Sequence, residues 1–241
     1  MSAVDITLPE PTKEQIDGVK SLEELFALMR VTNWAGGSGR FRPGDMTIHF
    51  LSKMRGFLVD LRGTGRPEAQ FAKQACDAVV EALRGQASNG DVATWACETA
   101  AYLAKDHSEN TARLVSADIC EALVQAMQAC DPLGRDLKLA VTGCAAMSAL
   151  AAAGRDVDAS SRLGDCGACE VVAAVLRGLS SIEQIAREGC RAAAALAAGH
   201  NDNKARLLAA GAREAIEAFA SNAKVEMDKG LARTTLEVLK G

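Results

Sequence analysis

Aromatic residues are scarce in this chain, which has two tryptophans and one tyrosine among 241 residues. Proline occurs only five times, and because proline breaks helix interiors, its scarcity in an alanine-rich chain favours an all-α fold. An excess of basic residues is also absent: the net charge is −4, so we expect no nucleic-acid partner, which would need a basic surface. No apolar run approaches about 20 residues, so we expect no membrane span and place the chain in the cytoplasm or the nucleus.

Catalytic motifs are absent as well. The glycine-rich segment 31–44 lacks the Gly-Lys-Ser/Thr ending of a phosphate-binding loop. Cys166-Gly-Ala-Cys169 has the spacing of half a zinc or redox site, but it has neither a second ligand pair nor a βαβ context. None of the three histidines can be associated with a nucleophile by its position in the sequence. We therefore expect no enzyme activity, no cofactor and no metal.

An internal repeat dominates what is present. Four helical runs align on Leu103, Leu150, Leu196 and Val238, at intervals of 47, 46 and 42 residues. Each follows another apolar run; three of these align on Leu114, Leu163 and Leu207, and a looser copy covers residues 69–83. Such a period is typical of helical solenoids, in which no unit can bury its apolar face alone.

The cysteines support this register. Cys97, Cys144 and Cys190 each lie six residues before the aligned leucine of their run. Three more occupy one equivalent position in the preceding run: Cys76, Cys120 and Cys169. Because repeat positions are packing positions, we expect these cysteines to be free, buried thiols rather than metal ligands or disulfides.

The last copy shows the expected local structure of one unit. Ser181 with Gln184 fits a capping box at a helix start, and Gly199 is a natural helix stop. Asn203 is predicted to cap the next helix. Gly211 then permits a sharp change of direction between two helices, with a positive φ.

These features resemble the armadillo repeat family over residues 66–241. The resemblance rests on Asn203 with Leu207, on Ala210-Gly211-Ala212 and on Leu196-Ala197. It implies a right-handed α-solenoid, an armadillo-like superhelix, that binds a partner peptide or helix in its concave groove. Gln74 and Asp118 replace the turn glycine in the first two copies. The Trp/Asn ladder by which importin alpha binds peptides is replaced by Glu98, Tyr102, Ala145, Ala149, Arg191, Ala195, Arg233 and Glu237.

The chain divides into three segments by this register. Residues 1–11 are predicted to be a flexible N-terminus, and residues 12–65 a helical cap or degenerate repeat. Residues 66–241 hold about four repeats. Within the cap, residues 45–62 have the apolar stripe of an amphipathic helix.

Aromatic residues supply one candidate contact site. Trp95, Glu98 and Tyr102 are spaced i, i+3 and i+7, so they share one helical face. Exposed aromatic side chains are favoured interface anchors. Trp95 fits the core or the surface equally well, and we expect Tyr102 to be exposed.

Basic residues supply a second candidate site. The register implied by the resemblance places Arg187, Arg191, Lys229 and Arg233 on the groove, with few acidic neighbours apart from Glu237. Four like charges attract an oppositely charged ligand, so we expect a protein partner that offers an acidic segment. The alternative is a structural module of a larger assembly that contacts partners by its ends or convex face. Exposure of Phe50, Met54 and Phe57 would favour that alternative.

Overall fold

The computed structural model describes residues 11–31, 45–63, 69–129, 136–154 and 158–240, and every regular element in these ranges is an α-helix. In chain order the helices are α1 (Lys13–Gly18), α2 (Leu22–Val31), α3 (Asp45–Gly63), α4 (Ala69–Gly85), α5 (Gly90–Ala104), α6 (Ser108–Ser116), α7 (Ile119–Ala129), α8 (Leu137–Ala153), α9 (Ala159–Asp165), α10 (Ala168–Leu179), α11 (Glu183–Ala197), α12 (Asn201–Ala209), α13 (Ala212–Asn222) and α14 (Glu226–Lys240). None of these helices is long and apolar enough to cross a membrane. Most of the predicted flexible N-terminus and most of the glycine-rich segment lie outside the described residues.

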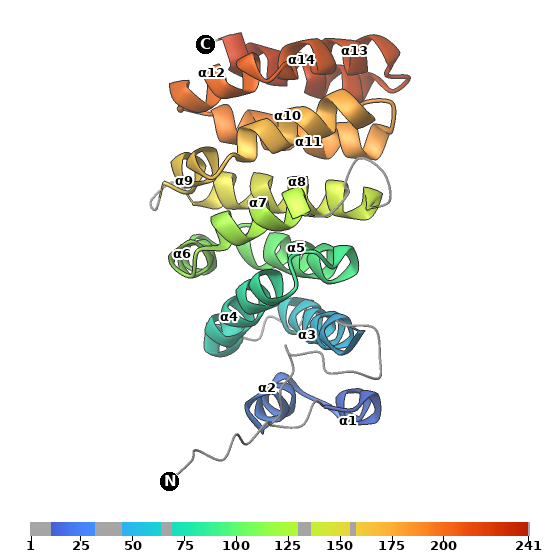
Figure 1. Ribbon diagram of the computed structural model, residues 1–241, viewed down its shortest axis with the longest axis vertical. Helices are drawn as coiled ribbons and strands as arrows, with labels where there is room; N and C mark the ends of the chain where they lie inside the picture. Colours follow the sequence, from blue (N-terminus) through green and yellow to red (C-terminus); the bar gives the residue numbers. More distant parts are fainter. Residues whose placement is uncertain (1–10, 32–44, 64–68, 130–135, 155–157, 241) are drawn as a thin grey trace.

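The helices stack into a solenoid, as the repeat predicts (Figure 1). One column of packed helices runs α3, α5, α8, α11, α14, and we call the last four the third helices. A second column runs α4, α7, α10, α13. The short helices α6, α9 and α12 complete the repeats, while α1 and α2 lie at the opposite end of the stack from α14.

The turns between first and second helices depend on a left-handed residue. Gly211 has φ 81° and Gly167 has φ 97°, which confirms the predicted role of Gly211. Asp118 occupies the same place with φ 61°, because a short polar side chain tolerates this conformation better than most. Gln74 does not turn at all: α4 continues straight through it. The first full repeat therefore has one long helix where later repeats have two.

Two of the predicted caps are wrong. Asn203 does not cap α12 but lies inside it, 3% exposed, and its side-chain amide donates to the carbonyls of Ser160 and Leu196, each at 2.9 Å. Asn110 similarly donates to Leu103 at 3.1 Å. Ser181 does not begin α11 either, because Ile182 is the N-cap residue and offers no side-chain bond. The asparagine is thus a buried link between repeats.

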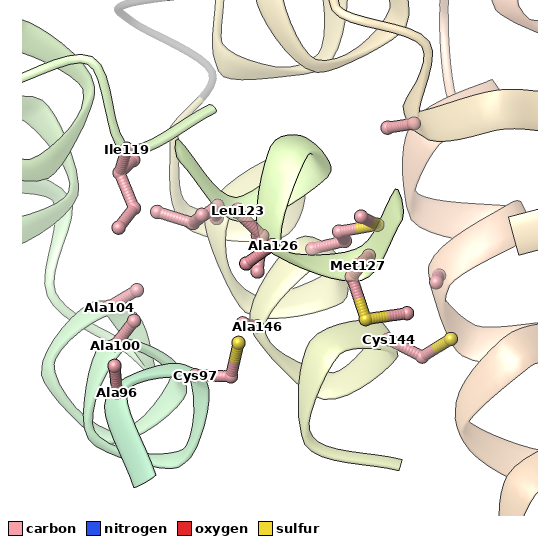
Figure 2. Close-up of a cluster of buried hydrophobic side chains, with 14 of the residues drawn as sticks. Ala96, Cys97, Ala100, Ala104, Ile119, Leu123, Ala126, Met127, Cys144 and Ala146 are labelled. Carbon is pink, nitrogen blue, oxygen red and sulfur yellow. The ribbon is translucent and has the colours of Figure 1, made fainter. Parts of the chain in front are cut away.

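The core mixes large apolar side chains with many small residues, such as Ala96, Cys97 and Ala100, that let helices approach closely (Figure 2). A Cβ on Gly143 would lie 2.3 Å from the Met127 sulfur, and a Cβ on Gly189 would lie 2.7 Å from Leu176. Both glycines precede a repeat-equivalent cysteine, so the Gly-Cys pair marks where a second helix crosses a third helix. The seven cysteines of the described residues are free thiols and all but Cys166 are buried, which confirms the packing prediction.

The N-terminal helices follow local rules. Thr12 and Gln15 form the capping box of α1. The α3 stripe is buried at its centre, where Phe50, Met54 and Leu58 are at most 1% exposed. This end of the stack therefore has its own apolar packing.

Candidate partner-binding face

The third helices carry every residue predicted to bind a partner. Trp95, Glu98 and Tyr102 lie on α5, whereas the basic residues lie on α11 and α14. The column order α5, α8, α11, α14 places α8 between the two sets, so the fold does not bring them together. Between them α8 offers Thr142, Ala145 and Ala149, which are half-buried. We call the side of the third helices that carries these residues the third-helix face.

Trp95 is half-buried and lines a cavity of about 680 Å³ formed by the start of α1, one side of α3 and α5. The sequence left open whether Trp95 lies in the core or on the surface, and the side chain lies partly in each. One part of the indole packs against the core and another borders the cavity.

Glu98 and Tyr102 are held by contacts with α3. Glu98 forms an ion pair with Arg55 at 2.9 Å. The Tyr102 hydroxyl donates to the Leu58 carbonyl at 3.0 Å, and the Arg55 guanidinium lies 5.9 Å from the Tyr102 ring centroid. Tyr102 is therefore half-buried rather than exposed as predicted, because it packs the cap helix α3 against α5. No pattern in the sequence indicates the contact of Arg55 with Glu98 and Tyr102.

Arg187 is committed to an internal contact. Its guanidinium donates to both carboxylate oxygens of Asp228 on α14, at 2.5 and 2.8 Å, and also lies 3.5 Å from Glu183. The Asp228 side chain is only 1% exposed. The hydrogen bonds from Arg187 hold the pKa of Asp228 below its ordinary value, so the carboxylate is charged near neutral pH.

The other three cations also have acidic neighbours, so the prediction of few acids on this surface is wrong. Arg191 pairs with Glu188 at 2.5 Å. Lys229 and Arg233 both approach Glu226, at 3.6 and 3.5 Å. The sequence contained the signal, since Glu188 lies three residues before Arg191 and Glu226 three before Lys229. The surface therefore carries nearly balanced charge.

A second cavity, of about 500 Å³, lies where α8 and α11 end. His200 borders it, with Nδ1 3.4 Å from the Ser161 hydroxyl and Nε2 3.7 Å from Asp158. Sequence reasoning missed this proximity of a serine, a histidine and an aspartate. The distances are long for proton transfer, and Asp158 Oδ1 also accepts the Ser161 backbone N–H as the cap of α9. We assign these contacts to joining the starts of α9 and α12.

The cysteines form no metal site within the described residues, because no group of three histidine, cysteine, aspartate or glutamate side chains there could hold a metal ion. Cys166 is half-exposed, and burial still raises the pKa of its thiol to about 11. The described geometry around Cys166 and Cys169 thus gives no support to a metal or redox role.

The three residues whose exposure would favour the structural-module alternative are not exposed. Phe50 and Met54 are buried and Phe57 is half-buried. Large apolar side chains are exposed instead at Val59 on α3 and at the starts of third helices, at Leu137, Ile182, Val225 and Met227.

Comparisons with known proteins identify the architecture. No known family profile and no curated protein matches the chain. Among solved structures, a computationally designed armadillo repeat protein for modular peptide recognition matches with a TM-score of 0.62 at 19% identity, over 94% of this chain and 89% of that one. A designed armadillo repeat protein in complex with the peptide (KR)4 matches with a TM-score of 0.60 at 18% identity, over 94% and 90%. The chain therefore has an armadillo-like helical-repeat fold.

Proposed function

We propose that this armadillo-like solenoid is a protein-recognition scaffold, rather than an enzyme, that binds a peptide or helix of a partner along its third-helix face. The observation that carries the proposal is the unbroken stack of α5, α8, α11 and α14, which offers a long surface built on a rigid core. The small residues Ala145 and Ala149 of α8 let a bound chain approach the helices closely. Two structurally similar proteins are described as recognising or binding peptides.

An acidic ligand segment remains our proposal for the C-terminal half of the face. Arg191 and Arg233 have 49% and 69% of their side chains exposed. Glu226 is 73% exposed, and because exposed ion pairs are worth only about 0–1 kcal/mol, a ligand carboxylate can replace Glu226 beside Arg233 at little cost. Arg187 is not available in this way, because it binds the buried Asp228.

A peptide-binding experiment tests the proposal. Fluorescence anisotropy would compare an acidic octapeptide, (DE)4, with the basic (KR)4. We expect the acidic peptide to bind, with an affinity that weakens as salt rises. The double variant Arg191→Glu, Arg233→Glu should lose this binding while its helical circular dichroism is unchanged.

The matched control is Lys20→Glu, Lys73→Glu, which changes the net charge equally at two exposed residues that lie on no third helix. If this control weakens binding as much as the arginine variant, the effect is only one of net charge. If (KR)4 binds and (DE)4 does not, the acidic-ligand proposal is wrong. If neither binds, peptide recognition by this face loses its support.

A second candidate, contact with a larger assembly through one edge, is favoured by a different observation. Leu137, Ile182 and Val225 are exposed at or just before the starts of three successive third helices. Apolar side chains repeated along one edge offer a contact surface independent of the third-helix face. Replacing Val225 and Met227 by serine should reduce binding of an assembly partner without changing peptide binding.

A further inference from the structure

The cavity beside Trp95 has an origin in the packing of the cap. Helix α1 packs on one side of α3, while α5 packs on another. Asp45, Ile48 and Ser52 of α3 border the cavity and, spaced i, i+3 and i+7, share one helical face. Met46 borders the cavity as well. The resulting volume of about 680 Å³ falls within the range of about 300–1,000 Å³ typical of ligand sites. Through the core of the stack, by contrast, buried alanines, leucines and cysteines pack between the helices.

The walls of this cavity are largely apolar and one of them is aromatic. Pro11, Met46, Ile48 and Trp95 all line it. No described residue accepts a hydrogen bond from the Trp95 indole N–H, and the side-chain hydrogen bond made to Trp95, from the Thr99 hydroxyl, goes to its backbone carbonyl. A half-buried tryptophan with an unused donor can both pack against an apolar side chain and donate to a peptide carbonyl.

The rim of the cavity carries more negative than positive free charge. Glu14 and Asp45 line it, and neither forms an ion pair within the described residues. Two basic side chains line the cavity, Lys13 and His49. His49 already has an acidic partner, because its Nε2 lies 2.6 Å from Asp17, so Lys13 is the lining cation without an ion pair in the described residues. Two free carboxylates against one ammonium favour a ligand that brings a cation to the rim.

We propose that this cavity binds an extended peptide segment in which an apolar side chain is followed by a basic residue. The apolar side chain packs on Trp95, Met46 and Ile48, and the basic residue lies at Glu14 and Asp45. This inference rests on the proposed function, and it specifies which ligand side chains the N-terminal end of the solenoid would bind. A partner segment would then be apolar and basic over the cap and acidic near Arg191 and Arg233.

Three blocked tetrapeptides serve as probes: Ac-Gly-Leu-Arg-Gly-NH2, its Leu-Glu analogue and its Gly-Arg analogue. The protein carries Trp34→Phe, which leaves Trp95 as its only tryptophan. Binding is followed by the indole N–H signal of Trp95 in a ¹H–¹⁵N spectrum. We expect the Leu-Arg peptide to bind at least about threefold more tightly than either analogue.

Two variants separate the apolar from the charged contribution. Trp95→Phe should weaken the binding of the two leucine-containing peptides, measured by the backbone N–H signals of Met46 and Ile48. Circular dichroism checks that this variant keeps its fold. Glu14→Gln with Asp45→Asn should abolish the preference for arginine over glutamate but keep the preference for leucine over glycine. The inference would be overturned if the Trp95 indole N–H signal shifted equally with all three peptides. It would also be overturned if no peptide shifted this signal up to its solubility limit. The Arg191→Glu, Arg233→Glu variant should bind these tetrapeptides normally, so failure here and failure of the acidic-ligand proposal are distinguishable.

Discussion

Arg187 of α11 donates two hydrogen bonds to Asp228 of α14, at 2.5 and 2.8 Å, although the two residues are 41 positions apart in the chain. The Asp228 side chain is 1% exposed, whereas Arg187 is 28% exposed. A buried carboxylate needs a partner of this kind, because an unpaired charge in the interior is strongly destabilising. The pair therefore joins the last repeat to the one before it, and this role removes Arg187 from the predicted binding site.

Replacing Asp228 by asparagine should lower the melting temperature by several degrees at pH 7. The pKa of Asp228 lies below its ordinary value of 3.8, so its charged form stabilises the folded state above that pH. This contribution is lost as the pH falls through the lowered pKa, and the variant should lose less stability than the wild type in that range. Thermal melts at pH 7 and pH 3 measure both effects. Glu226→Gln, at an exposed pair, should change stability by no more than about 0.5 kcal/mol; equal effects of the two variants would mean that burial of Asp228 has no energetic consequence.

Replacing Gly211 by valine should destabilise the fold by about 1–3 kcal/mol, the cost of a strained backbone. Its φ of 81° is unfavourable for a β-branched residue, and a Cβ would lie 3.2 Å from Arg177 Cδ. Urea denaturation gives the free energy of unfolding. Gly56→Ala is the control, because Gly56 lies inside α3 with nothing within 4 Å, and alanine there should stabilise by about 0.5–1 kcal/mol. A neutral Gly211 variant would contradict the strain argument.

Replacing Asn203 by alanine should destabilise by about 1–3 kcal/mol, since it leaves the buried carbonyls of Ser160 and Leu196 without this donor. Asn110→Ala should cost less, because the Asn110 amide donates to the Leu103 carbonyl alone. Asn201→Ala, at an exposed residue of α12, should be nearly neutral. Denaturant melts give the free energy of unfolding of each variant. A larger loss of stability for Asn110→Ala than for Asn203→Ala would contradict the role of Asn203 as a link between repeats.

Native thiols should react slowly with a disulfide reagent at pH 8. Burial raises the pKa of Cys76, Cys120 and Cys144 to about 12, so only about one thiol in ten thousand is ionised at this pH. Cys166, half-exposed with a pKa of about 11, should react first among the cysteines of the described residues. Peptide mapping by mass spectrometry identifies the modified residue. All eight cysteines should titrate after denaturation without reductant; a smaller number would reveal disulfides.

Turns and helix positions were predictable where a short-range rule governs them. Gly211 adopts the expected positive φ, because its conformation depends on neighbours a few residues away, and the capping box of Thr12 and Gln15 obeys the same kind of short-range rule. The prediction for Asn203 was wrong for the opposite reason. Helix propensity rules treat asparagine as a cap, but this asparagine finds a carbonyl acceptor at Ser160 in the preceding repeat, 43 positions earlier.

Charge pairing at the candidate site was only partly predictable. The three-residue spacing of Glu188 and Arg191 is a signal readable from the sequence, and it argues against the expected excess of positive charge. The contact of Arg55 with Glu98 has no such signal, since it depends on how α3 packs against α5.

By itself, the sequence determined an all-α solenoid, the register of its repeats and the burial of its repeat-equivalent cysteines. These follow from apolar periodicity and from residues such as Gly211 whose preferences are local. The tertiary structure decided which side chains of the third-helix face are free and which are committed to internal contacts. Tyr102 and Arg187 became internal links, and Trp95 came to border a cavity, because α3 and α14 pack against the helices that carry them. Such partners are distant along the chain and are fixed only when the helices stack.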